Sequence, residues 1–114
     1  MALTGVGHSM MRDISQKRVA ITDNSLVTLV AAVADSKIKV FAFFMSSASA
    51  TKFTLRSGNN AIFDIHATDT WGVLALNSLS NIPLFATNEG EVLTIQQTDE
   101  DLIDANVYLQ YTTE

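Results

Sequence analysis

Residues 37–45 read KIKVFAFFM, and this stretch decides the fold. Polar and apolar residues alternate over its first half, which is the period-2 pattern of a β-strand. Its second half is apolar on both faces, so we expect the strand to be buried on two sides. The predicted faces carry Ile38, Val40, Ala42 and Phe44 on one side, and Lys39, Phe41, Phe43 and Met45 on the other.

The same alternation recurs along most of the chain. Short clusters of Gly, Asn, Asp and Ser interrupt it at spacings of about 8–12 residues, as in an antiparallel sandwich or barrel. Pro83 cannot donate to a ladder and predicts a weak edge strand after it. No long helix is expected. The eight or nine predicted strands cover residues 18–22, 26–33, 37–45, 52–56, 61–66, 71–76, 84–87, 91–98 and 104–112.

The composition suggests that this small domain hides apolar surface against another protein. The chain has 114 residues, enough for a single core, and has no cysteine for a disulfide scaffold or a thiolate metal site. It is 47% hydrophobic and 17% charged, against about 25% charged in ordinary globular domains. No apolar run approaches the roughly 18 residues of a membrane span. We therefore expect a homo-oligomer and no membrane partner.

The charges are sorted along the chain. The net charge of −5 argues against a nucleic-acid partner, which would need Lys and Arg to neutralise phosphates. Residues 1–56 hold all seven basic residues and three acidic ones, whereas residues 57–114 hold nine acidic ones. Either the fold interleaves the two halves and cancels the asymmetry, or a basic patch meets the acidic patch of a neighbouring copy.

Residues 1–17 differ from the rest and are predicted to form an N-terminal arm before a β-sandwich domain over residues 18–114. Gly5 and Gly7 favour flexibility, and neither a helical nor a strand period persists. Ser9 could cap a short helix with Met10, Met11 and Ile14 on one face, if the arm docks on a partner.

No constellation of residues predicts an enzyme. The best ion-binding candidates are one strand end with its loop and one acidic loop, and both are more typical of a solvated surface. There is no nucleophile elbow and no glycine loop that would cradle the phosphates of a cofactor. With two histidines, a cupin-type metalloenzyme is disfavoured. The two candidate sets are Asp64, His66 and Asp69, and Asp99, Glu100, Asp101 and Asp104.

The ordered stretches resemble the small jelly-roll-like β-sandwich modules of tailed-bacteriophage virion proteins, including capsid decoration or cement proteins. The resemblance covers roughly residues 19–112 and consists of strand and turn patterns without catalytic signatures. Its stretches are LVTLVAA at 26–32, KIKV at 37–40, KFTLRSGN at 52–59, PLFAT at 83–87, GEVLTI at 90–95 and NVYLQY at 106–111.

The resemblance implies a structural, non-enzymatic protein without cofactors. It would be made in the host cytoplasm and would stabilise the capsid surface of the virion as a homotrimer bound to the major capsid protein. Predicted docking residues are Met10, Met11, Arg12 and Ile14 in the arm, and predicted subunit contacts are Phe41, Phe43 and Trp71. The alternative is a carbohydrate- or receptor-binding module of a fibre or tail, with Trp71, Asn77 and Asn81 contacting a sugar.

Overall fold

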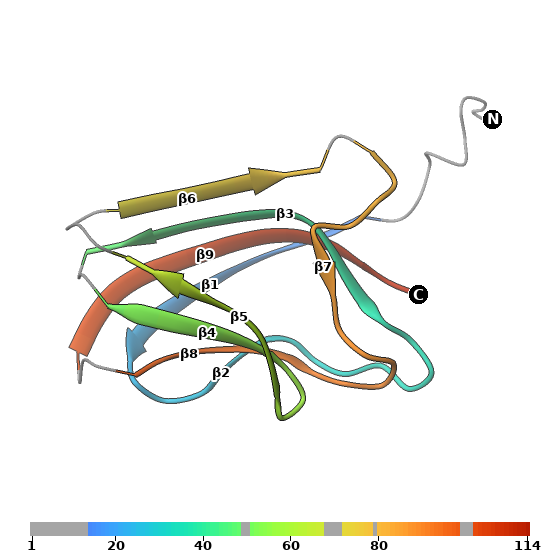
Figure 1. The fold of residues 1–114 in the computed structure, drawn as a ribbon, viewed down its shortest axis with the longest axis horizontal. Helices are drawn as coiled ribbons and strands as arrows, with labels where there is room; N and C mark the ends of the chain where they lie inside the picture. Colours follow the sequence, from blue (N-terminus) through green and yellow to red (C-terminus); the bar gives the residue numbers. More distant parts are fainter. Residues whose placement is uncertain (1–13, 49–50, 68–71, 79, 99–101) are drawn as a thin grey trace.

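The structure is a computed structural model that describes residues 14–48, 51–67, 72–78, 80–98 and 102–114. Two antiparallel sheets pack together into a β-sandwich, with nine strands in the described part of the chain (Figure 1). The predicted all-β fold class is therefore confirmed. No described segment is a helix of the length and apolarity needed to span a bilayer.

One sheet contains five strands. Its order is β1 (Ser15–Asp23), β9 (Leu102–Thr113), β3 (Ile38–Ser47) and β6 (Gly72–Asn77), with β7 (Phe85–Ala86) also paired to β3. The first strand therefore lies beside the last, and β9 and β3 form the middle of the sheet. β1 and β6 lie at its two edges.

The second sheet contains four strands in the order β2 (Val27–Val30), β8 (Leu93–Gln97), β4 (Lys52–Ser57) and β5 (Asn60–His66). Most connections along the chain pass from one sheet to the other, and the exceptions are β4–β5 and β6–β7. This alternation brings segments that are distant in sequence to face one another across the sandwich.

The core consists of the inward side chains of both sheets. Alternate residues of each strand are apolar, so pairing the sheets removes one face of each from water. Among the largest fully buried side chains of the described residues, Gln97 is the polar one, and it accepts a hydrogen bond from the Thr51 hydroxyl at 3.1 Å. The fully buried apolar residues include Ile21, Leu29, Val40, Phe43, Phe53, Leu55, Leu93, Ile95 and Leu109.

A β-bulge in β3 corrects the predicted faces of this strand. The register with β9 passes from Val40 opposite Tyr111 to Ala42 opposite Gln110, which leaves Phe41 as the extra residue. One extra residue exchanges the faces of everything that follows it. As a result Val40 and Phe43 point into the same core, whereas Phe44 is 36% exposed on the outer face.

The predicted strand over residues 26–33 is shorter in the structure. β2 ends at Val30, and the residues from Ala31 to Asp35 are exposed. Asp35 has a φ of 61°, a conformation that Asp tolerates in turns. The apolar run therefore supplies a connecting segment rather than a longer buried strand.

The β4–β5 hairpin turns where the sequence predicts, at residues 57–60. Gly58 has a φ of 57°, which suits a residue without a Cβ atom. Next to it, the Glu91 carboxylate accepts hydrogen bonds from the Ser57 hydroxyl at 2.6 Å and the Asn88 side-chain amide at 3.2 Å. These contacts tie the hairpin to the segment that leads into β8.

Candidate functional site

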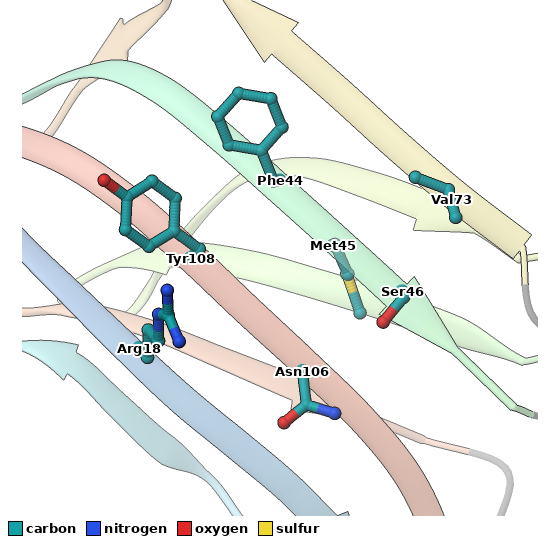
Figure 2. Close-up of a pocket in the computed structure, with 7 residues that line it drawn as sticks. All are labelled: Arg18, Phe44, Met45, Ser46, Val73, Asn106 and Tyr108. Carbon is teal, nitrogen blue, oxygen red and sulfur yellow. The ribbon is translucent and has the colours of Figure 1, made fainter.

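The outer face of the five-stranded sheet carries a row of side chains that crosses four strands. Arg18 on β1 lies opposite Tyr108 on β9, Tyr108 lies opposite Phe44 on β3, and Phe44 lies opposite Ala75 on β6. Residues in register on one face are close enough for their side chains to interact. Figure 2 shows three members of this row, Arg18, Tyr108 and Phe44, side by side on the sheet.

The row is held together by contacts through the Tyr108 ring. The Arg18 guanidinium carbon lies 5.7 Å from the ring centroid, within the range of a cation–π interaction. The Phe44 ring lies 5.9 Å from that of Tyr108, at an interplanar angle of 36°. The Gln110 side-chain amide donates to the Tyr108 hydroxyl at 2.9 Å. Tyr108 is therefore fixed by three neighbours and in turn orients Arg18.

A second row lies one step along the sheet. Asn106 on β9 pairs with Ser46 on β3, which pairs with Val73 on β6. Val73 is 75% exposed, the largest exposed fraction among the large hydrophobic residues described. Together the two rows line a surface depression of about 390 Å³ (Figure 2). Its lining residues are Arg18, Phe44, Met45, Ser46, Val73, Asn106 and Tyr108.

Three polar groups of this depression, the side chains of Arg18, Asn106 and Ser46, have no hydrogen-bond or ion-pair partner within the described residues. The salt bridge between Lys39 and Glu114, at 3.3 Å, is the one formed by the described part of the chain, and it does not involve Arg18. The side chains of Asn106 and Ser46 likewise make no hydrogen bond to any described residue. A cation, an amide and a hydroxyl whose hydrogen-bonding capacity no described residue uses therefore face the same apolar depression.

The outer face of the other sheet is polar. Thr54 and Asp64 lie opposite each other, and the Thr54 hydroxyl donates to the Asp64 carboxylate at 2.7 Å. His66 is exposed on the same face, as predicted, while Asp69 lies outside the described residues. Within the ranges that the structure describes, no three His, Cys, Asp or Glu side chains group in a way that could hold a metal ion.

The acidic loop lies largely outside the description. Asp99, Glu100 and Asp101 fall outside the described residues, while Asp104 is exposed on β9. Of the four candidate ligands at this loop, the structure therefore places Asp104.

The structure describes only some of the residues predicted to dock the arm or to join subunits, and these differ in exposure. Met10, Met11, Arg12 and Trp71 lie outside the described residues, and Ile14 is 42% exposed immediately before β1. Phe41 keeps 7% of its surface at the bulge. Phe43 is fully buried in the core of its own domain, 6.0 Å from the Phe85 ring, so it has no surface to offer to another subunit.

The two asparagines of the predicted sugar site are both exposed. Asn77 lies on β6, opposite Ala42 and two residues from Ala75, so it shares the outer face with Phe44. Asn81 follows in the segment between β6 and β7.

The residues of the depression were missed because their proximity depends on strand pairing. The alternation in residues 104–112 predicts that Asn106 and Tyr108 share a face with one another. Nothing local indicates that β1 lies beside β9, or that the bulge turns Phe44 outward. The sequence signal that remained was the excess of aromatic residues in 41–44.

The two charge-sorted halves of the chain are interleaved. Lys17 and Arg18 lie on β1 beside β9, and the basic residues of β4 lie between β5 and β8. The Lys39–Glu114 ion pair joins the two halves directly. This is the first of the two interpretations that the sequence left open, and it removes the expectation of one basic and one acidic pole in the described part of the molecule.

Fold and site together define an antiparallel β-sandwich protein with an aromatic depression on one outer face. No protein-family model matches the chain, and no curated protein matches its sequence. Among solved structures, the chain is similar to one described by the words "Bacillus endospore appendages form a novel family of disulfide-linked pili". The TM-score is 0.48 and the identity 13%, over 96% of each chain, a likeness too weak to inform function.

Proposed function

We propose that the protein is a structural, non-catalytic protein that assembles as a homo-oligomer and decorates the capsid of a tailed bacteriophage. The proposed self-assembly is supported by the edge strand β6, which reads GVLALN and contains neither a charged residue nor a proline. All six of its residues pair regularly with β3 on one side. A regular, uncharged edge of this kind invites pairing with another chain.

The other edge strands carry features that oppose such pairing. β1 has Lys17 and Arg18, and β5 has Asp64 and His66. β2 has four residues, and its register with β8 shifts between Thr28 and Val30. Charges, short length and irregular register all protect an edge from unwanted partners. Since β6 lacks these features, it is the edge best suited to contact a second copy.

The assignment to a capsid rests on the resemblance of the strand pattern to phage decoration and cement modules, which implies a trimer. In this proposal the sandwich makes the contacts between copies, and the arm, through Met10, Met11, Arg12 and Ile14, contacts the major capsid protein. Buried area added across the seams of the shell would then resist its expansion.

The oligomer is tested by light scattering at micromolar concentration, with three times the mass of the 12.4 kDa chain as the expected result. Ala75→Glu adds a charge to β6 and should shift the equilibrium toward monomer. Ala61→Glu is the matched control, because it places the same exposed substitution on β5 of the other sheet. A monomeric wild type, or equal effects of the two substitutions, would contradict the proposal.

The docking of the arm is tested by deleting residues 1–13. β1 begins at Ser15, before the expected Arg18, so this deletion spares every residue of the sheet. The truncated protein should keep its circular dichroism spectrum and oligomeric state but no longer bind expanded phage shells. Full occupancy of shells by the truncated protein would show that residues 1–13, with Met10, Met11 and Arg12, are not the docking element.

A second candidate function is saccharide binding at a phage fibre or tail. It is favoured by the aromatic depression, in which exposed ring surface lies beside polar groups that have no partner among the described residues. Small-molecule sites combine apolar walls with a few such convergent polar groups. Nuclear magnetic resonance titration with a panel of neutral and acidic oligosaccharides tests this function, and an absence of shifts across the panel would exclude it.

A further inference from the structure

We propose that the depression on the five-stranded sheet binds a carboxylated saccharide, such as a uronic or sialic acid, with Arg18 as the carboxylate-binding residue. This inference rests on the second candidate function and names its ligand class. The outer face of the other sheet offers a comparison, because it carries Arg56 without an aromatic neighbour among the described ring contacts.

The Arg18 guanidinium has the charge and the orientation needed to bind a carboxylate. Arg18 is exposed and makes no salt bridge to a described residue, so its charge is not neutralised from within the described part of the domain. Its contact with the Tyr108 ring restricts the orientation of the planar group. A guanidinium held in this way presents two parallel N–H donors, the geometry that a carboxylate accepts in a bidentate manner.

The second step is the apolar surface beside this charge. Phe44 keeps 36% of its surface and Val73 keeps 75%, and both line the depression with Tyr108. A pyranose ring has an apolar face of C–H groups that packs on aromatic and aliphatic surface. The depression, at about 390 Å³, is within the roughly 300–1,000 Å³ of small-ligand sites.

The third step is recognition of hydroxyl groups. Asn106 and Ser46 lie in the row next to Arg18 and Tyr108, and their side chains have no partner among the described residues. An amide and a hydroxyl can each donate and accept, as sugar hydroxyls require. Figure 2 shows both side chains along one side of the depression.

The position of the depression within the sheet favours a saccharide over an extended peptide. Its floor is formed by β9 and β3, which are central strands whose main-chain groups are committed to the ladders on both sides. A peptide strand is recognised mainly through free main-chain groups at a sheet edge. Here side chains alone are available, and they match the carboxylate, ring face and hydroxyls of an acidic sugar.

Because the net charge of the protein is −5, a preference for acidic over neutral sugars would point to a local binding site. A generally acidic protein does not attract anions by its overall charge, so binding of an acidic sugar must come from a local site. We therefore expect glucuronate- and sialate-terminated oligosaccharides to bind at least about tenfold more tightly than their neutral counterparts. A hydrogen bond to a charged group contributes at least the free energy that corresponds to about a tenfold change in affinity.

The experiment is titration calorimetry with paired acidic and neutral oligosaccharides, with acetate and an acidic peptide as further arms. Arg18→Ala should abolish the preference for acidic sugars, and Arg18→Lys should weaken it, because lysine cannot bind bidentately. Tyr108→Phe keeps the ring and should retain most of the affinity. Arg56→Ala removes an equal charge from the other sheet and should have no effect. Circular dichroism checks the fold of each variant.

The outcomes separate this inference from the function on which it rests. Equal binding of neutral and acidic sugars would leave saccharide binding in place and overturn the role of Arg18. Absence of binding to every saccharide would overturn both. Binding of acetate or the acidic peptide as tightly as the acidic sugars would show that the depression recognises charge without a sugar ring, and this also overturns the proposal.

Discussion

Two adjacent phenylalanines of β3 differ in burial because they point to opposite faces of the sheet. Phe43 is fully buried against Phe85, whereas the next residue, Phe44, lies on the outer face beside Tyr108. Phe43→Ala should lower the free energy of unfolding by about 3–5 kcal/mol, since it removes a large core side chain and leaves a cavity. Phe44→Ala should lower it by about 1 kcal/mol, because it removes a partly exposed aromatic contact. Urea denaturation followed by circular dichroism measures both.

This comparison also tests the register of β3. If the bulge at Phe41 were absent, Phe44 would point inward and Phe43 outward. The order of the two destabilisations would then be reversed. Similar values for the two variants would contradict the assignment of the faces.

A surface turn provides a second prediction at the residue scale. The Ser25 hydroxyl and then the Ser25 backbone N–H donate to the Asp23 carboxylate, and these bonds lower the pKa of Asp23 below its usual 3.8. A lowered folded-state pKa contributes stability above pH 3.8 that is lost as the pH falls through the folded value. Ser25→Ala removes the larger cause, so nuclear magnetic resonance titration should show the pKa of Asp23 rising toward 3.8.

At the scale of elements, glycine is required at two turns for different reasons. Gly58 and Gly90 have φ values of 57° and 76°, so Ala at either position adopts a left-handed conformation that costs about 1 kcal/mol. At Gly58 the added Cβ would also lie 3.0 Å from the Glu91 carboxylate, which Ser57 holds by a hydrogen bond. At Gly90 nothing lies within 4 Å.

Gly58→Ala should therefore destabilise the protein by about 2 kcal/mol, and Gly90→Ala by about 1 kcal/mol. Thermal unfolding of both variants measures the difference. A double variant with Glu91→Ala should remove the extra cost at Gly58, because it deletes the carboxylate that the new Cβ displaces. Equal costs at the two glycines would show that Glu91 does not restrict the hairpin.

The elements also show what the sequence could predict. Strand positions followed from alternation, because each strand buries one face, and the β4–β5 hairpin followed from Gly58 and its neighbours. The bulge at Phe41 could not be predicted, since no glycine or proline marks it. The Arg18–Tyr108–Phe44 row could not be predicted either, because it combines that bulge with the pairing of β1 to the C-terminal strand.

At the scale of the whole molecule, the interleaved charges and the uncharged β6 edge together decide how copies should associate. Strands from the basic and acidic halves of the sequence alternate within the sheets, and Lys39 pairs with Glu114. No single-sign pole is then available in the described part to attract an opposite pole on another copy. Association through β6 would depend on backbone hydrogen bonds and on Val73 and Ala75, which carry no charge.

The oligomer should therefore be insensitive to salt. Raising the sodium chloride concentration from about 0.05 M to about 0.5 M shortens the screening length severalfold and weakens contacts between exposed charges. Apolar contacts and ladder hydrogen bonds do not weaken in this way. Analytical ultracentrifugation across that range should give a constant or slightly stronger association. Dissociation on adding salt would indicate that charged patches, and not β6, join the copies, and Ala75→Glu would then leave the association unchanged at every salt concentration.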